Sequence, residues 1–167
     1  MEKFNQYFTE KFEEPLEQNE LHIVVLGKGG EEGTFADLAE EVCKDKKIKY
    51  NLINVDEAWI SQKDVEIGKV TIQNADGKDA SVEIETHNSI IFVRAGAIGT
   101  LAAQAIVSSL QVIGFFLVND LESMLACDNK MSNVIMLERN NIPTPRSSIL
   151  SNKKSIEDAH KRIGGKF

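Results

Sequence analysis

The feature that most constrains the fold is a short apolar run followed by a glycine-rich turn, a helix and a second apolar run. Residues 21–26 (LHIVVL) are rich in β-branched side chains, which is typical of a strand buried on both faces. A helix is predicted to begin after Thr34, and a second strand is predicted over residues 48–55. Strand, helix and strand within this length make a βαβ unit with parallel pairing and a right-handed crossover. The sequence therefore predicts an α/β fold.

The succession of buried strands and helices is interrupted once, by a segment with the pattern of an antiparallel hairpin. Residues 70–84 alternate apolar and polar side chains around Asp76-Gly77, which predicts an antiparallel hairpin exposed on one face. Residues 89–93 resume the mostly parallel sheet, and a helix is expected from near Ile98 to Gly114. The remaining expected elements are a strand over 115–118 and helices over 121–127, 130–140 and 156–163.

Two of these helices carry an apolar stripe that we expect to face the sheet. In the first helix the stripe comprises Phe35, Leu38, Ala39, Val42 and Cys43. In the helix that ends at Gly114 it comprises Leu101, Ala102, Ala105, Ile106, Leu110 and Ile113.

Composition limits the classes of partner. The chain has 167 residues, enough for about one domain, and a net charge of −7 from 19 basic and 26 acidic side chains. This excess of acid argues against nucleic acid and against an anionic membrane as partners. The apolar stretches are shorter than the ~20 residues of a membrane span. Cys43 and Cys127 are far apart, so we expect neither a disulfide nor a cysteine-based zinc site, and a cytoplasmic location fits best.

The glycine-rich turn lies at the carboxyl end of the first strand, where parallel sheets often contact ligands. The spacing of Gly27, Gly29 and Gly33 is one residue too long for a dinucleotide-binding turn. Glu31 and Glu32 would also repel phosphate, so phosphate binding is the less favoured hypothesis. Two other interpretations of this turn stay open: a flexible connection between strand and helix, and a contact to substrate.

Two cations are candidate binding residues. Arg94 ends an apolar strand just before Gly96, and a guanidinium there suits bidentate binding of carboxylate or phosphate; the alternative is a salt bridge to an acidic side chain. Lys130 begins a helix, where the helix dipole does not favour a cation, so it is either solvated or helps to bind a phosphate. The scattered histidines, His22, His87 and His160, predict no metal site, and we expect no catalytic residue.

Four segments occur in an order that resembles the N-terminal part of an ATP-grasp carboxylate–amine ligase, nearest to the RimK-like glutamate ligases and prokaryotic glutathione synthetases. They are residues 92–96 (FVRAG), 118–120 (VND), 126–130 (ACDNK) and 137–145 (LERNNIPTP). The resemblance covers roughly residues 89–167 and rests on topology before that. It implies a Rossmann-like three-layer pre-ATP-grasp domain over 21–120 and an incomplete start of the ATP-grasp domain over 121–167. Residues 1–20 are extra to the resemblance, and the helical spacing of their aromatic side chains predicts a helical arm.

The resemblance also implies a chemistry. In that family ATP and magnesium activate a carboxylate as an acyl phosphate, which an amine then attacks. Arg94 and Gly96 match a strand-end motif that contacts the carboxylate substrate, and Lys130 matches a lysine that contacts nucleotide phosphate. Asn129 separates Lys130 from Asp128, which departs from the family's pattern and weakens any role for Asp128.

In the family, further nucleotide and magnesium ligands would follow Phe167. We therefore expect this chain to be the substrate-side portion of a ligase for a small carboxylate, amino acid or peptide, inactive and free of cofactor by itself, and completed by further protein such as a complementing ATP-grasp chain. Two alternatives remain open: a stand-alone Rossmann-like module that binds a small anion, and a protein-interaction module. For the latter, the aromatic side chains of residues 1–20 would pack on the domain or mediate a homodimer.

Overall fold

The computed structural model describes residues 20–28, 34–74 and 81–164. Three of the expectations above lie outside the described residues: the aromatic arm, most of the glycine-rich turn and the Asp76-Gly77 turn. The chain divides into two compact units, Met1–Leu121 and Glu122–Phe167, and each is described by itself.

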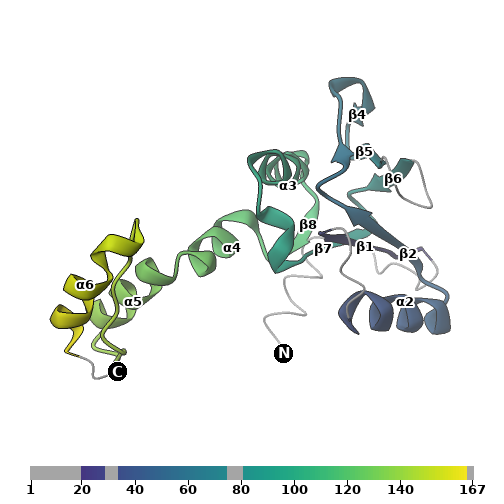
Figure 1. Cartoon of the computed structure of the whole chain (residues 1–167). Coiled ribbons are helices and arrows are strands. Elements are labelled where there is room, and N and C mark those ends of the chain that lie inside the picture. The colour runs from purple at the N-terminus through teal and green to yellow at the C-terminus, as the bar shows by residue number, and fades with distance from the viewer. Residues whose placement is uncertain (1–19, 29–33, 75–80, 165–167) are drawn as a thin grey trace. The chain divides into compact units, whose positions relative to one another are not determined.

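The first unit is built on a parallel sheet with the strand order β2-β1-β7-β8. Helix α2 connects β1 to β2, helix α3 connects β7 to β8, and the two helices lie on opposite faces of the sheet (Figure 1). This arrangement confirms the predicted α/β, Rossmann-like three-layer fold. The elements are β1 (His22–Gly27), α2 (Thr34–Lys46), β2 (Lys49–Asn54), β7 (Ser89–Val93), α3 (Leu101–Ile113) and β8 (Phe116–Val118).

The core lies where β1 and β7 are covered on both faces. Val24, Val25 and Leu26 of β1 are fully buried, and β7 pairs with them in register, with Leu26 opposite Val93. Burial of these aliphatic side chains supplies the hydrophobic stabilisation that the continuous apolar run predicts, about 25 cal/mol per Å² of apolar surface.

A second, antiparallel sheet forms the predicted excursion. Strands β5 (Lys69–Asn74) and β6 (Ser81–Glu85) pair with alternating burial, so that one face is covered and the other is in solvent. Two strands of two residues each, β3 (Ala58–Trp59) and β4 (Val65–Glu66), pair with β5 and were not predicted. The 3₁₀ helix η1 (Gln62–Asp64) joins them, capped by Ser61, whose side chain accepts a hydrogen bond from the Lys63 amide.

Helix α3 begins three residues later than expected. Ala95–Ile98 forms the 3₁₀ helix η2, and the Thr100 hydroxyl oxygen then accepts a hydrogen bond from the Ala103 amide at 3.1 Å, which caps α3. Gly114, with φ of 105°, ends the helix in the left-handed conformation that glycine adopts at little cost.

The predicted apolar stripes are only partly correct. In α2, Cys43 is buried, but Leu38 and Val42 are 58% and 48% exposed, because α2 covers the sheet with only one side of its stripe. In α3, Ile106 and Leu110 are buried as expected. The sheet side of α3 is Ala103, Ile106, Val107 and Leu110, whereas Leu101, Ala102 and Ala105 are exposed.

The second unit consists of short helices. Residues 141–152, which contain Pro143 and Pro145, form neither helix nor strand. Arg146 Nη1 donates a hydrogen bond to the Ile163 carbonyl at 3.3 Å, which satisfies a carbonyl at the end of the last helix. The elements are α4 (Leu121–Asp128, whose first residue belongs to the first unit), α5 (Lys130–Arg139), η3 (Lys153–Ser155) and α6 (Ile156–Ile163). Among all described residues, no helix is both long and apolar enough to cross a membrane.

Candidate functional site

The strand order places a topological switch point between β1 and β7. From β1 the chain passes through α2 to β2 on one side, and later returns to β7 on the other side of β1. Because the connecting helices leave on opposite faces, the loops after the two central strands diverge, and ligands of open α/β sheets bind at this point. The first residues beyond these two strands are Lys28 and Arg94.

Backbone hydrogen bonds fix these strand ends next to one another. The Arg94 amide donates to the Leu26 carbonyl at 3.0 Å, and the Val55 amide donates to the Gly27 carbonyl at 2.9 Å. The carboxyl ends of β2, β1 and β7 are therefore held side by side up to their last residues. The 3₁₀ helix η2 begins directly after Arg94, and Gly96 is its second residue. The Ala97 amide donates a hydrogen bond to the Arg94 carbonyl at 2.9 Å.

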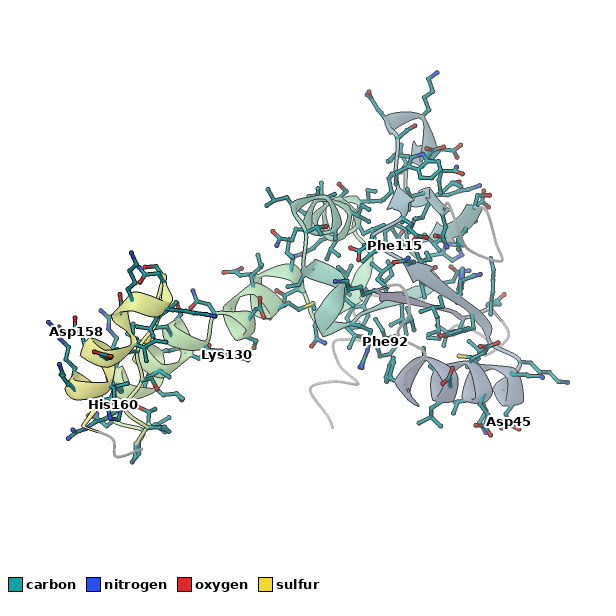
Figure 2. The ribbon with its side chains drawn as sticks, viewed as in Figure 1. Asp45, Phe92, Phe115, Lys130, Asp158 and His160 are labelled. Carbon is teal, nitrogen blue, oxygen red and sulfur yellow. The ribbon has the colours of Figure 1, made fainter. Side chains whose placement is uncertain are left out.

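The Arg94 side chain rests on an aromatic pair. Its guanidinium carbon lies 4.5 Å from the centroid of the Phe35 ring, and the Phe35 and Phe92 ring centroids are 5.9 Å apart. Figure 2 shows Phe92 on the α2 side of the parallel sheet. The ring quadrupole attracts the cation at this distance and favours side-chain conformations that keep the guanidinium over the ring.

Arg94 is exposed, and among the described residues it forms no ion pair with a carboxylate. In the part of the chain that the structure describes, the salt-bridge alternative therefore has no partner. The guanidinium carbon lies over the Phe35 ring, and the five N–H donors of an arginine lie in the plane of its guanidinium group. A planar fork that is oriented and unpaired can bind a carboxylate or a phosphate with two parallel hydrogen bonds.

The position of Phe35 depends on the start of α2. The Tyr50 hydroxyl donates a hydrogen bond to the Ala36 carbonyl at 3.1 Å, which ties the first turn of α2 to β2. Burial, together with the nearby acidic groups Glu40, Cys43 and Asp37, raises the pKa of Tyr50 to about 12. The phenol therefore keeps its proton, and with it this hydrogen bond, throughout the physiological pH range.

Lys130 begins α5 in the second unit (Figure 2). Its Nζ donates to the Cys127 carbonyl at 3.1 Å, and Asn133 Nδ2 donates to the same oxygen at 3.0 Å. Asn129 Oδ1 accepts from the Ser132 amide at 3.0 Å and caps α5. The ammonium group thus neutralises a carbonyl at the end of α4, a favourable place for a cation, while its side chain remains exposed.

Sequence reasoning missed two residues of the site at the sheet edge. Lys28 follows the first strand directly, and the switch-point rule would have singled it out once the strand order was known. Phe35 was treated as a packing residue only, because nothing in the sequence indicates that it underlies Arg94. Among the described residues, no group of three or more His, Cys, Asp or Glu side chains is placed to hold a metal ion.

The fold and this site define an α/β protein with an oriented cation at the carboxyl edge of a parallel sheet. No known family profile matches the chain. A segment of 63 residues is 32% identical to the alpha-aminoadipate–LysW ligase LysX of Saccharolobus solfataricus. The segment is 36% of this chain and 23% of that protein, so the similarity is confined to less than a quarter of the ligase. It links part of the chain to an ATP-grasp ligase.

Proposed function

We propose that the chain is the substrate-side portion of an ATP-dependent carboxylate–amine ligase, in which Arg94 binds the carboxylate substrate. The observation that carries this proposal is the guanidinium of Arg94 at the switch point of the sheet, which lies over the Phe35 ring and has no carboxylate partner among the described residues. The local similarity to a ligase named for alpha-aminoadipate supports the same class of substrate.

The proposed substrate is an amino acid with a side-chain carboxylate. The Arg94 fork would accept one carboxylate, and Lys28, the residue after the neighbouring strand, would add a second positive charge at the same edge. A substrate with two carboxylates uses both cations, whereas a monocarboxylate leaves one unused. Gly96 would let the η2 backbone approach the bound acid closely, because it carries no side chain.

In this proposal Arg94 and Lys28 do no bond-making chemistry. They hold the carboxylate in place and lower the cost of bringing a negatively charged acid to a chain of net charge −7. The complete enzyme would use ATP and magnesium to convert the acid to an acyl phosphate, as the resemblance implies. A small dicarboxylic amino acid or a peptide ending in one is the proposed class of substrate.

Lys130 is proposed to contact a nucleotide phosphate. It lies at the beginning of α5, and its only described hydrogen bond, to the Cys127 carbonyl, is one that an exposed and flexible side chain can exchange for a phosphate oxygen. Because most nucleotide contacts are expected outside this chain, its binding of Mg·ATP should be weak. In a titration extended to millimolar Mg·ATP, Lys130→Gln should weaken this binding several-fold relative to Lys153→Gln, which removes an exposed charge elsewhere in the same unit. Equal affinities would rule out this role for Lys130.

The substrate proposal is tested by calorimetric titration of the 167-residue chain with alpha-aminoadipate. Replacing Arg94 by Gln should weaken binding about 10- to 100-fold, the value of a charge-assisted bidentate contact. Arg94→Lys should be intermediate, because lysine keeps the charge and loses the planar fork. Arg139→Gln removes an exposed arginine from the second unit and should leave the affinity unchanged. No binding, or equal binding by all four proteins, would contradict the proposal.

A further inference from the structure

Two buried oxygen atoms lie where the chain passes between the parallel and the antiparallel sheet. They are Oε2 of Glu57, in the turn after β2, and Oδ1 of Asn74, the last residue of β5. Both have essentially no surface open to water, and among the described residues neither accepts a hydrogen bond. A buried acceptor without a partner costs free energy, and an ionised carboxylate costs more than an amide. A partner with positive charge would remove this cost.

The strand pairing brings the two residues close together. Strand β3 pairs with β5 so that Ala58 lies opposite Asn74, and opposite residues of an antiparallel pair have Cα atoms about 4.5–5.5 Å apart. Glu57 precedes Ala58 directly, at about 3.8 Å between Cα atoms. The Cα atoms of Glu57 and Asn74 are therefore at most about 9 Å apart, a distance that a glutamate and an asparagine side chain can bridge through one ion.

Backbone hydrogen bonds hold both residues in place. The Glu57 amide donates to the Asn54 carbonyl at 3.2 Å, and the Asp56 amide donates to Asn54 Oδ1 at 3.2 Å, which fixes the turn after β2. Strand β5 is held by its ladder with β6 up to Gln73, the residue before Asn74. Ligands that are fixed before an ion binds lose less conformational entropy on binding.

The surroundings of the two oxygens select the kind of partner. Among the described residues, no basic side chain forms an ion pair with Glu57. Because neither oxygen has exposed surface, neither has room beside it for a water molecule. A calcium ion lies ~2.3–2.6 Å from its oxygen ligands, closer than the ~2.7–2.8 Å of a hydrogen-bonded water. Calcium takes carboxylate, amide and backbone carbonyl oxygens, whereas Mg²⁺ usually keeps several waters.

We propose that Glu57 Oε2 and Asn74 Oδ1 bind a calcium ion, which joins the turn after β2 to the end of β5. Neither Arg94 nor the acid takes part, so this site is independent of the proposed function. It contains one acidic side chain, which agrees with the absence of a group of three His, Cys, Asp or Glu side chains among the described residues. Backbone carbonyls would supply the other ligands. With a single carboxylate, the dissociation constant should be about 10⁻⁴–10⁻³ M.

The first test is thermal unfolding of the full chain after removal of metal ions. Calcium at about 10 mM should raise the melting temperature by about 3–10 °C, and magnesium should raise it less. Glu57→Gln removes the charge and should abolish the rise, as should Asn74→Leu, which removes the amide oxygen. Asp56→Asn removes the neighbouring, exposed carboxylate and should keep the full rise.

Both test variants should fold without calcium. The amide that Glu57→Gln introduces can donate a hydrogen bond to Asn74 Oδ1. Asn74→Leu adds an apolar side chain to the face of β5 that buries Val70 and Ile72. In calcium-free buffer each variant should therefore unfold at the wild-type temperature or above it, because each removes an acceptor that lacks a partner.

The second test is terbium luminescence, because terbium replaces calcium in protein sites. Trp59, the single tryptophan of the chain, lies two residues from Glu57 and can transfer energy to an ion bound there. Excitation of Trp59 should produce terbium emission that calcium displaces. Glu57→Gln should lose this emission, and Asp56→Asn should keep it. Decay rates in H₂O and D₂O should show an ion with few bound waters.

A wild-type melting temperature that calcium leaves unchanged would overturn the proposal. So would a rise, or a displaceable terbium emission, that Glu57→Gln leaves at the wild-type value. Decay rates of a mostly hydrated ion would also overturn it, since such an ion would lie at the surface of the protein and not between two buried oxygens.

Discussion

The guanidinium of Arg94 lies 4.5 Å from the centre of the Phe35 ring and thereby connects the end of β7 to the first turn of α2. These two elements flank the switch point, and both begin or end beside the carboxyl end of β1. The contact gives Arg94 a defined orientation although its side chain is exposed. An exposed arginine that an aromatic ring holds in place loses less conformational entropy when it binds a carboxylate.

The first prediction concerns Phe35. Phe35→Leu keeps an apolar side chain but removes the ring, and should weaken alpha-aminoadipate binding about twofold to fivefold, the value of an exposed cation–π contact. Phe35→Tyr keeps the ring and should restore the affinity. The proton resonance of Arg94 Nε should also lose its ring-current shift in Phe35→Leu without any ligand. An unchanged resonance would contradict the contact itself, whereas an altered resonance with unchanged affinity would contradict only its role in binding.

The second prediction concerns the hydrogen bond that holds the first turn of α2. Tyr50→Phe removes the hydroxyl that donates to the Ala36 carbonyl and should lower the free energy of unfolding by about 1 kcal/mol, measured by urea denaturation. The affinity for the acid should fall slightly, since Phe35 is the residue before Ala36. A variant as stable as the wild type would show that this hydrogen bond does not position α2.

The third prediction is a pH dependence of stability. His22 is 2% exposed, and its Nε2 lies 2.8 Å from Asn51 Oδ1. Burial lowers the pKa of His22 below 6.5; the hydrogen bond to Asn51 opposes this shift and the Lys49 charge adds to it. The unfolded chain therefore binds a proton at this histidine more readily. The contribution of His22 to the free energy of unfolding should be constant above pH 7 and should decrease as the pH falls below about 6.5.

Chemical denaturation at pH 7.5 and pH 5.5 measures this effect. His22→Gln, which can still donate a hydrogen bond to Asn51, should reduce the difference between the two pH values. His87→Gln, at an exposed histidine, should preserve it. If His22→Gln and the wild type lose equal stability between the two pH values, another group is responsible.

The fourth prediction concerns the thiols. Cys127 is exposed, whereas Cys43 is buried in α2, and burial raises the pKa of the Cys43 thiol, which lowers its fraction of reactive thiolate. A thiol reagent should therefore modify one cysteine rapidly in the native protein and the second only on unfolding. Rapid reaction of both thiols would show that α2 opens readily from the sheet.

Much of the first unit can be predicted from the sequence, because its central strands are continuous apolar runs and its helices carry clear end signals. Gly114 predicts the end of α3, and the alternation around residues 70–84 predicts the hairpin. The start of α3 is predicted three residues too early, near Ile98, because Thr100 is not recognised from the sequence as its N-cap. Strands β3 and β4 could not be predicted, since two residues are too few to show a periodicity.

The orientation of α3 and the surroundings of Arg94 could not be read from the sequence. A helix without charged residues has no polar side to mark which face meets solvent. The apolar stripe predicted for α3 therefore includes residues that the structure shows to be exposed, such as Leu101 and Ala105. Arg94 was identified as a strand-end cation, but its support by Phe35 depends on how the first turn of α2 packs against β7. That contact joins residues far apart in the sequence and follows from tertiary structure alone.

In the proposed function the acid binds at the carboxyl ends of β1 and β7. Amide chemical-shift mapping of the full chain, titrated with alpha-aminoadipate, tests it most directly. We expect the largest changes at Gly27, Lys28, Arg94 and Gly96. Changes that are largest in β5 and β6, or no changes at millimolar ligand, would contradict it.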